Sequence, residues 1–191
     1  MARVSVSLFA VFVTVVALGV PAGATAMAPV PPQDFVVGGG EVGIFHEIAI
    51  DARSDPLGGD PSGTVSFVVD ANVGGQPVRL RFESPPTCLA VEGNRAVIVF
   101  PTFIAPIKVV VVDNGSTGSL ADEFGAILFA TTGCSDATGV AVSPLSSGDI
   151  VVRDAPSKAQ CLDGGWRNYT DATGQPFKNQ GVCIAFALGV A

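Results

Sequence analysis

Short stretches dense in β-branched and aromatic residues recur along this 191-residue chain, separated by glycine, proline, asparagine and aspartate. Such stretches are typical of β-strands that bury at least one face. The first of them places five side chains on one face of an extended strand: Val42, Ile44, His46, Ile48 and Ile50. We predict eight strands, at residues 42–50, 63–70, 77–83, 87–93, 95–100, 107–113, 126–131 and 149–154.

The connections between these stretches predict antiparallel pairing. Gly93 and Asn94 form a two-residue loop of the kind that a tight hairpin requires, and residues 71–77 resemble a second hairpin connection. The loop at 113–125 is longer and has room for one helical turn. Outside the N-terminus no stretch of 12 or more residues has helical periodicity, so the crossover helices of a parallel sheet are missing.

We therefore predict an all-β fold, in which residues 41–155 form one antiparallel β domain. A small antiparallel β-barrel is favoured over a β-sandwich, because closure removes the exposed edges of valine-rich strands. The β-sandwich remains the alternative.

The N-terminus has the layout of a secretory signal peptide. Arg3 precedes an uncharged apolar run from Val4 to Val20, and Pro21 and small residues follow. We predict cleavage after Ala26, so that residues 1–26 are removed and 27–40 form a flexible Pro/Gly spacer. The alternative, an uncleaved membrane anchor, is disfavoured because this run is short and no basic residue follows it closely.

The charge of the mature chain limits its partners. The predicted signal contains one of the 10 basic residues and none of the 17 acidic ones, which leaves a net charge of 9 − 17 = −8. Such a chain repels phosphate, so we predict no nucleic-acid partner and no binding to anionic lipid. The simplest interpretation of the charge is solubility outside the cell, which fits a secreted, extracellular protein without a stable membrane anchor after cleavage.

Four cysteines in an exported chain predict two disulfide bonds. Of the three possible pairings we favour the one in which Cys161 and Cys183 close a short local loop, which leaves Cys88 to pair with Cys134. Chain entropy makes the local bridge worth about 3 kcal/mol and the longer one about 4 kcal/mol. With no Cys-x-x-Cys pair and one histidine, no metal site is predicted on the thiols.

Candidate catalytic chemistry is sparse. His46 is the only histidine and could act as a general base in a barrel interior, helped by Glu47 or Asp51, but no nucleophile motif accompanies it. A secreted enzyme of unknown class using the interior near His46 is therefore an alternative, and no catalytic residue is assigned.

Two other patterns bear on ligands and cofactors. Asp51, Asp55 and Asp60 could hold calcium, although their spacing fits ordinary turn chemistry better. The glycines at 38–40 precede a strand and not a helix, which does not suit a phosphate site, so no cofactor is predicted.

The stretch between Cys161 and Cys183 differs from the rest, because it is polar and contains the only tryptophan and the only tyrosine. An aromatic ring beside amides and basic groups suits carbohydrate or peptide recognition. Alternatively, Trp166 and Phe177 pack this loop against the β domain, and Asn179 and Gln180 hold turn backbone. The candidate binding residues are Trp166, Arg167, Tyr169, Lys178, Asn179 and Gln180.

The same region resembles a known group. "SKAQCLDGGWRNY" at 157–169 and "FKNQGVCIAF" at 177–186 are similar to the C-terminal signature of largely uncharacterised secreted actinobacterial proteins. The link "TDATGQP" at 170–176 is longer than is usual in that group. Residues 51–98 are also similar to a β-rich module of bacterial exported proteins. The resemblance implies export and a disulfide-closed tail at 156–191, with no substrate attached.

These patterns together predict an exported non-catalytic β module. Its expected partner is a cell-envelope, carbohydrate or protein ligand, and a purely structural exported protein is a further alternative.

Overall fold

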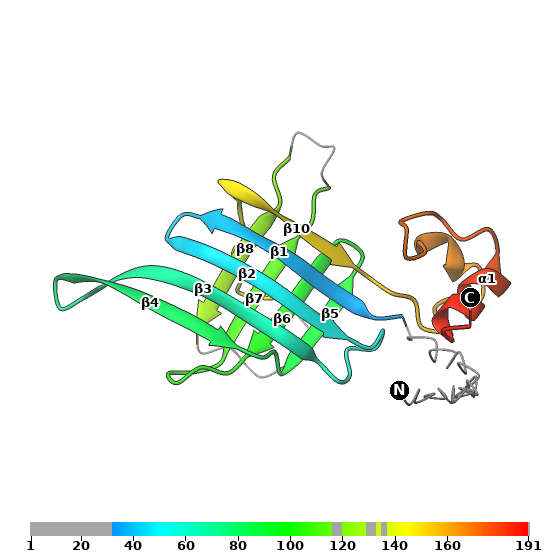
Figure 1. Cartoon of the computed structure of the whole chain (residues 1–191), viewed down its shortest axis with the longest axis horizontal. Helices are drawn as coiled ribbons and strands as arrows, with labels where there is room; N and C mark the ends of the chain where they lie inside the picture. The colour runs from blue at the N-terminus through cyan, green and yellow to red at the C-terminus, as the bar shows by residue number, and fades with distance from the viewer. Residues whose placement is uncertain (1–31, 116–119, 129–132, 135–136, 191) are drawn as a thin grey trace, which may run out of the picture.

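The computed structural model of the chain describes residues 32–115, 120–128, 133–134 and 137–190 (Figure 1). The predicted signal peptide and residues 27–31 of the predicted spacer lie outside these ranges. The described strands are β1 (Asp34–Val42), β2 (Phe45–Ser54), β3 (Ser62–Val73), β4 (Gln76–Ser84), β5 (Cys88–Glu92), β6 (Arg95–Phe100), β7 (Ile107–Val112), β8 (Glu123–Leu128), β9 (Ser143–Pro144) and β10 (Ser147–Arg153). A 3-10 helix, η1 (Gly165–Asn168), and one α-helix, α1 (Gln180–Ala187), follow.

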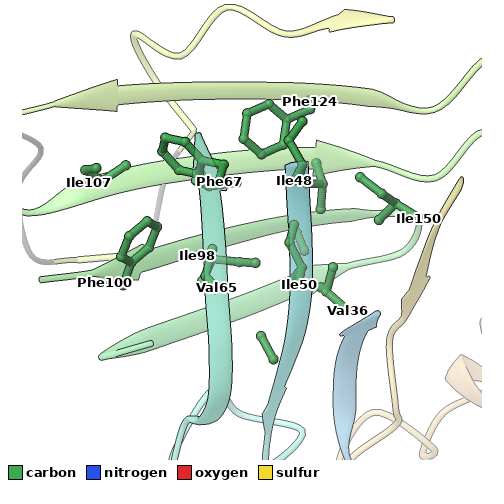
Figure 2. Packing of buried hydrophobic residues seen from close by; sticks show 14 of the residues in the cluster. Val36, Ile48, Ile50, Val65, Phe67, Ile98, Phe100, Ile107, Phe124 and Ile150 are labelled. Carbon is green, nitrogen blue, oxygen red and sulfur yellow. The ribbon is translucent and has the colours of Figure 1, made fainter. Parts of the chain in front are cut away.

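The strands form two five-stranded sheets, in the order β10-β1-β2-β3-β4 and β5-β6-β7-β8-β9. All pairings are antiparallel, which confirms the predicted all-β antiparallel fold. In the described part of the chain no strand pairing joins the two sheets, so no closed barrel is found there. The inner faces of the two sheets share one core, over which their strands cross (Figure 2).

Phenylalanine rings fill the centre of this core. The Phe67 ring on β3 lies 5.6 Å from Phe82, 6.0 Å from Phe100 and 5.8 Å from Phe124, measured between ring centroids. Two of these contacts are edge-to-face, which the ring quadrupole favours. Phe100 and Phe124 belong to the second sheet, so Phe67 ties the two layers together.

Both faces of β7 are buried, which explains its continuous valine run. Val109 and Val111 face the main core, whereas Val110 packs in a second cluster on the opposite face of the same sheet. That cluster also contains Cys134 and Val140 from the segment after β8. The predicted disulfide between Cys88 and Cys134 is present and holds this segment on the sheet.

The predicted spacer is wrong from Asp34 onward, because these residues form β1 inside the first sheet. Gly38, Gly39 and Gly40 lie between β10 and β2, and a Cβ atom on any of them would collide with the backbone of a neighbouring strand. The triple glycine therefore permits close strand packing and does not mark a loose linker.

The predicted strand at 42–50 is also wrong in its bounds, because Gly43 and Ile44 form a turn between β1 and β2. A register shift then follows between His46 and Ala49, with Glu47 in a left-handed conformation at φ 49°. This bulge reverses which side chains face inward. As a result Phe45 and Ile48 contact the core, and His46 does not share their face.

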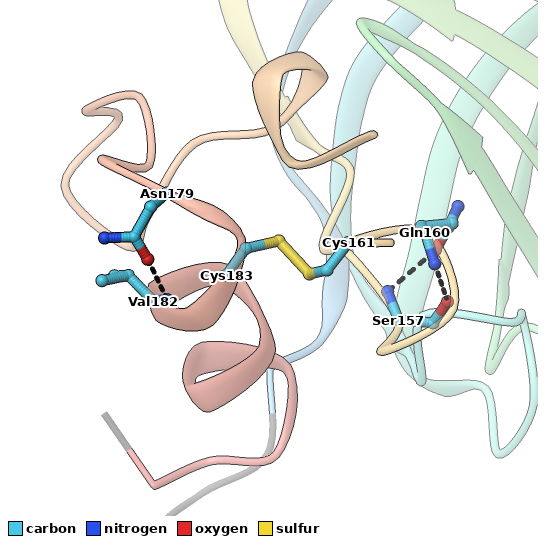
Figure 3. The surroundings of a disulfide bond; sticks show 6 residues. All are labelled: Ser157, Gln160, Cys161, Asn179, Val182 and Cys183. Atoms are coloured by element: carbon cyan, nitrogen blue, oxygen red, sulfur yellow. Dashed lines mark hydrogen bonds between the residues drawn. A yellow bond between two sulfur atoms is a disulfide. The ribbon is translucent and has the colours of Figure 1, made fainter. Parts of the chain in front are cut away.

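The tail after β10 has a small core of its own. The predicted disulfide between Cys161 and Cys183 joins the first turn of the tail to α1, with their Cα atoms 5.7 Å apart (Figure 3). Both cysteines and Phe177 are buried, and the Phe177 ring lies 5.2 Å from that of Phe186. Sequence analysis did not predict α1. Neither it nor any other helix in the described ranges has the length and apolarity needed to cross a bilayer.

Candidate functional site

The six predicted binding residues lie in the tail, but several of them have structural partners. Asn179 caps α1, since its side-chain oxygen accepts a hydrogen bond from the Val182 backbone N–H at 3.0 Å (Figure 3). Trp166 is half-buried in η1, and the Arg167 guanidinium carbon lies 4.6 Å from its ring centroid. Lys178 and Gln180 are exposed. Binding through the tail stays a prediction.

Tyr169 lies where the tail meets the β domain. It lines a hollow together with Glu92 and Arg95 of the second sheet, Asp154 and Gln160. Burial, and then the nearby carboxylates of Asp154, Asp34 and Glu92, raise the pKa of the Tyr169 hydroxyl. Tyr169 therefore packs at the junction between the tail and the β domain.

Two carboxylates hold the start of the tail. Asp34 accepts a hydrogen bond from the Ala155 N–H at 2.8 Å, and Asp154 accepts one from the Gly93 N–H at 2.8 Å. Burial raises the pKa of Asp34 to about 7, against the lowering effect of the Ala155 hydrogen bond. Burial likewise raises the pKa of Asp154. Arg153 adds a hydrogen bond to the Asp171 carbonyl at 2.9 Å.

His46 lies on the outer face of the first sheet. Its Nε2 atom is 3.1 Å from an Asp70 carboxylate oxygen, and Asp70 in turn pairs with Arg79 at 3.2 Å. Glu47 and Glu83 continue this surface network through Arg81, each at 3.2 Å. The arrangement neutralises charges across β2, β3 and β4, and it places His46 away from the interior in which a general base was considered.

Two of the three aspartates considered for calcium, Asp51 and Asp55, are used in local structure. Asp55 accepts hydrogen bonds from the backbone N–H groups of Leu57 and Gly59, both at 2.8 Å, and Asp51 pairs with Arg53 at 3.1 Å. Among the residues with described positions, no group of three or more histidine, cysteine or carboxylate side chains is arranged to hold a metal.

An apolar cleft opens where the inner faces of the two sheets part. The first sheet and its β1–β2 turn contribute Ile44, Phe45, Phe67, Val69, Ala71, Leu80 and Phe82. The second sheet and the loop before β7 contribute Ile104, Ile107, Ala126, Ile127 and Leu128. Every lining residue is apolar, and the cavity volume is about 220 Å³.

The rim of this cleft is exposed to solvent. Ile44 is 57% exposed, Ile104 is 47% exposed and Phe103 is 81% exposed. The Phe103 ring stacks on Phe82 with centroids 6.1 Å apart and planes at 14°, which extends the lining outward. The β3–β4 hairpin continues past the second sheet at this end (Figure 1). A contiguous exposed apolar patch of this kind is often a binding surface.

Sequence reasoning missed the cleft, because each lining residue alone resembles an ordinary core residue. The signal that could have revealed it is a difference in strand length. β3 and β4 have 12 and 9 residues, whereas β6 and β7 of the facing sheet have 6 each, so the hairpin extends beyond the sheet opposite it. No family model, curated protein or solved structure gives a significant match to this chain. The candidate site therefore depends on the geometry alone.

Proposed function

We propose that this protein is an exported, non-catalytic β-sandwich module that binds an apolar group of an envelope or protein ligand in the cleft between its sheets. The observation that carries the proposal is the all-apolar lining of the cleft, open to solvent at Ile44 and Ile104. An engineered cavity of about 150 Å³ lined by aliphatic and aromatic residues binds benzene. A cleft of about 220 Å³ therefore has room for one large apolar side chain or a short piece of an acyl chain.

The enzymatic alternative has less support. His46 is engaged by Asp70 on the outer face, and the cleft lining offers no titratable side chain that could act as an acid or base. Carbohydrate recognition also fits this cleft poorly, because sugar hydroxyls need polar partners, which its lining side chains do not supply. These arguments favour binding of an apolar group over reaction.

The test is binding of N-phenyl-1-naphthylamine, an uncharged dye that fluoresces in apolar surroundings. The variant Ala126→Phe fills the cleft from β8, and Ala49→Phe adds the same ring on the exposed outer face of β2. We expect the mature protein to bind the dye and Ala126→Phe to weaken binding at least about tenfold, which corresponds to 1.4 kcal/mol of lost contact.

Ala49→Phe should bind the dye like the unaltered protein, because its added ring lies away from the cleft. Equal dye affinity for Ala126→Phe and the unaltered protein would show that the cleft is not the binding site. Circular dichroism of both variants establishes that they are folded.

A further inference from the structure

We propose that the partner of the cleft is an extended peptide segment that adds to the first sheet as a sixth strand beside β4 and places one large apolar side chain in the cleft. This inference rests on the proposed function, and it names the partner class and the mode of binding.

The backbone of β4 is available for pairing. β4 is the last strand of its sheet, and among the described residues no side chain or neighbouring strand donates to or accepts from its outer edge. Pro77 near its start also fits an edge position, since proline lacks the N–H that a central strand needs. Alternate residues of the nine-residue strand β4 therefore present unpaired backbone groups at its outer edge.

The opposite edge of the same sheet is closed. On β10 the Ile150 N–H donates to Asp122 at 2.7 Å, and the Val152 N–H donates to Asp113 at 3.0 Å. Asp113 and Asp122 lie between β7 and β8, so this connection of the second sheet supplies hydrogen-bond acceptors to the β10 edge. Strand addition is thus directed to β4.

The side chains of β4 match an added strand. Val78, Leu80 and Phe82 face inward, and Leu80 and Phe82 line the cleft, so alternate residues of a neighbouring strand would point into the same apolar space. No charged residue of β4 points inward to block pairing, because Arg79 and Arg81 lie on the outer face, where Asp70 and Glu47 neutralise them.

The exposed apolar area favours a short segment over a second copy of the protein. Ile44, Phe103, Ile104, Ile127 and Leu128 are exposed by 39–81%. At roughly 150–200 Å² per large side chain, they present on the order of 450 Å². A stable protein–protein interface buries about 800 Å² on each partner. Strand addition to a peptide needs less area, because backbone hydrogen bonds supply part of the affinity.

The probe is a fluorescent hexapeptide amide in which threonine alternates with valine and phenylalanine, together with two backbone-methylated versions. One version is N-methylated on every threonine and the other on every apolar residue. In a paired strand only alternate N–H groups face the neighbour. We expect the parent peptide to bind by fluorescence anisotropy, one methylated version to lose at least about tenfold in affinity, and the other to bind nearly unchanged.

Several outcomes would overturn this inference. If both methylated peptides bind like the parent, or both lose binding alike, strand addition is excluded. The proposed function still stands in that case, provided that Ala126→Phe weakens dye binding. Displacement of the dye by dodecanoate but not by the hexapeptide would assign the cleft to an acyl chain. A dimer in sedimentation that dissociates in Ala126→Phe would assign the cleft to a second copy.

Discussion

The two edges of the first sheet differ in how their backbone groups are satisfied. At β10, the carboxylates of Asp122 and Asp113 accept the outward N–H groups of Ile150 and Val152. At β4 no such acceptor is present within the described residues, and the adjoining space is apolar. The β10 edge is therefore closed by side-chain acceptors, whereas the β4 edge leaves its outward backbone groups and the neighbouring apolar surface accessible.

Two of the acidic residues, Asp113 and Asp122, hold backbone N–H groups at the β10 edge. Asp122 is buried and accepts from the Ile150 and Asn114 N–H groups, and Asp113 accepts from those of Val152 and Gly115. Each carboxylate thus joins the segment after β7 to the edge of the other sheet. These two carboxylates therefore have a structural role at the β10 edge.

The largest expected effect comes from opening the β10 edge with Asp122→Ala. The Ile150 and Asn114 N–H groups would lose a charged acceptor, and Ile150 is fully buried. We expect the free energy of unfolding to fall by about 2–4 kcal/mol in urea denaturation. The matched control is Asp149→Asn, an exposed neighbour on β10.

Asp149→Asn should leave the free energy of unfolding nearly unchanged or slightly higher, because partial desolvation, together with the charge and hydrogen bond of the neighbouring Asp122, raises the pKa of the Asp149 carboxyl and disfavours its charge. If Asp122→Ala and Asp149→Asn have equal effects, the β10 edge does not depend on its carboxylate acceptor.

A second prediction concerns pH at the junction of β1 and the tail. The pKa of Asp34 is about 7 in the folded protein against an ordinary value of 3.8. Between these values the folded protein keeps a proton that the unfolded chain has released, so the free energy of unfolding falls as pH rises from about 4 to 7. The contribution of this group is about 2–4 kcal/mol.

Asp34→Asn should flatten that pH profile and be more stable than the unaltered protein at pH 8, because the amide oxygen still accepts from the Ala155 N–H. Asp34→Ala should flatten it as well, but with lower stability at pH 5, where the hydrogen bond is lost. Thermal unfolding across this pH range measures both, and an unchanged slope in Asp34→Asn would contradict the assignment.

The smallest expected effect on stability is at the open side, with Phe103→Ser. Because this ring is 81% exposed, we expect the free energy of unfolding to change by at most about 0.5 kcal/mol. Binding of the dye and of the hexapeptide should nevertheless weaken, since the ring extends the cleft beyond Phe82. If Phe103→Ser lost much stability but bound both probes like the unaltered protein, Phe103 would stabilise the fold and would not belong to the binding surface.

Much of the strand pattern follows from sequence, because β-branched runs and turn residues act locally. Gly93 and Asn94 join β5 to β6 as predicted. The hairpin expected at 71–77 does join β3 to β4, but its loop is only Gly74 and Gly75, because both strands extend into the predicted connection. The disulfide pairing also follows, since a local bridge leaves one other pair. The observed β8 begins at Glu123, three residues before its predicted start.

The features that could not be predicted from the sequence depend on contacts between segments that are distant along the chain. β1 was missed because three consecutive glycines are typical of a linker, and only the pairing with β10 and β2 shows that they lie inside a sheet. His46 was misplaced because the bulge at Glu47 reverses the alternation. The cleft comes from segments distant in sequence, and its exposure depends on where the second sheet stops.

Amide hydrogen exchange of β10 and β4, resolved by nuclear magnetic resonance with and without the parent hexapeptide, tests the difference between the edges most directly. We predict that the Ile150 and Val152 amides are protected in the free protein, whereas alternate amides of β4 exchange rapidly and become protected when the peptide binds. Rapid exchange at Ile150 and Val152, or β4 amides that the peptide leaves unchanged, would contradict the account.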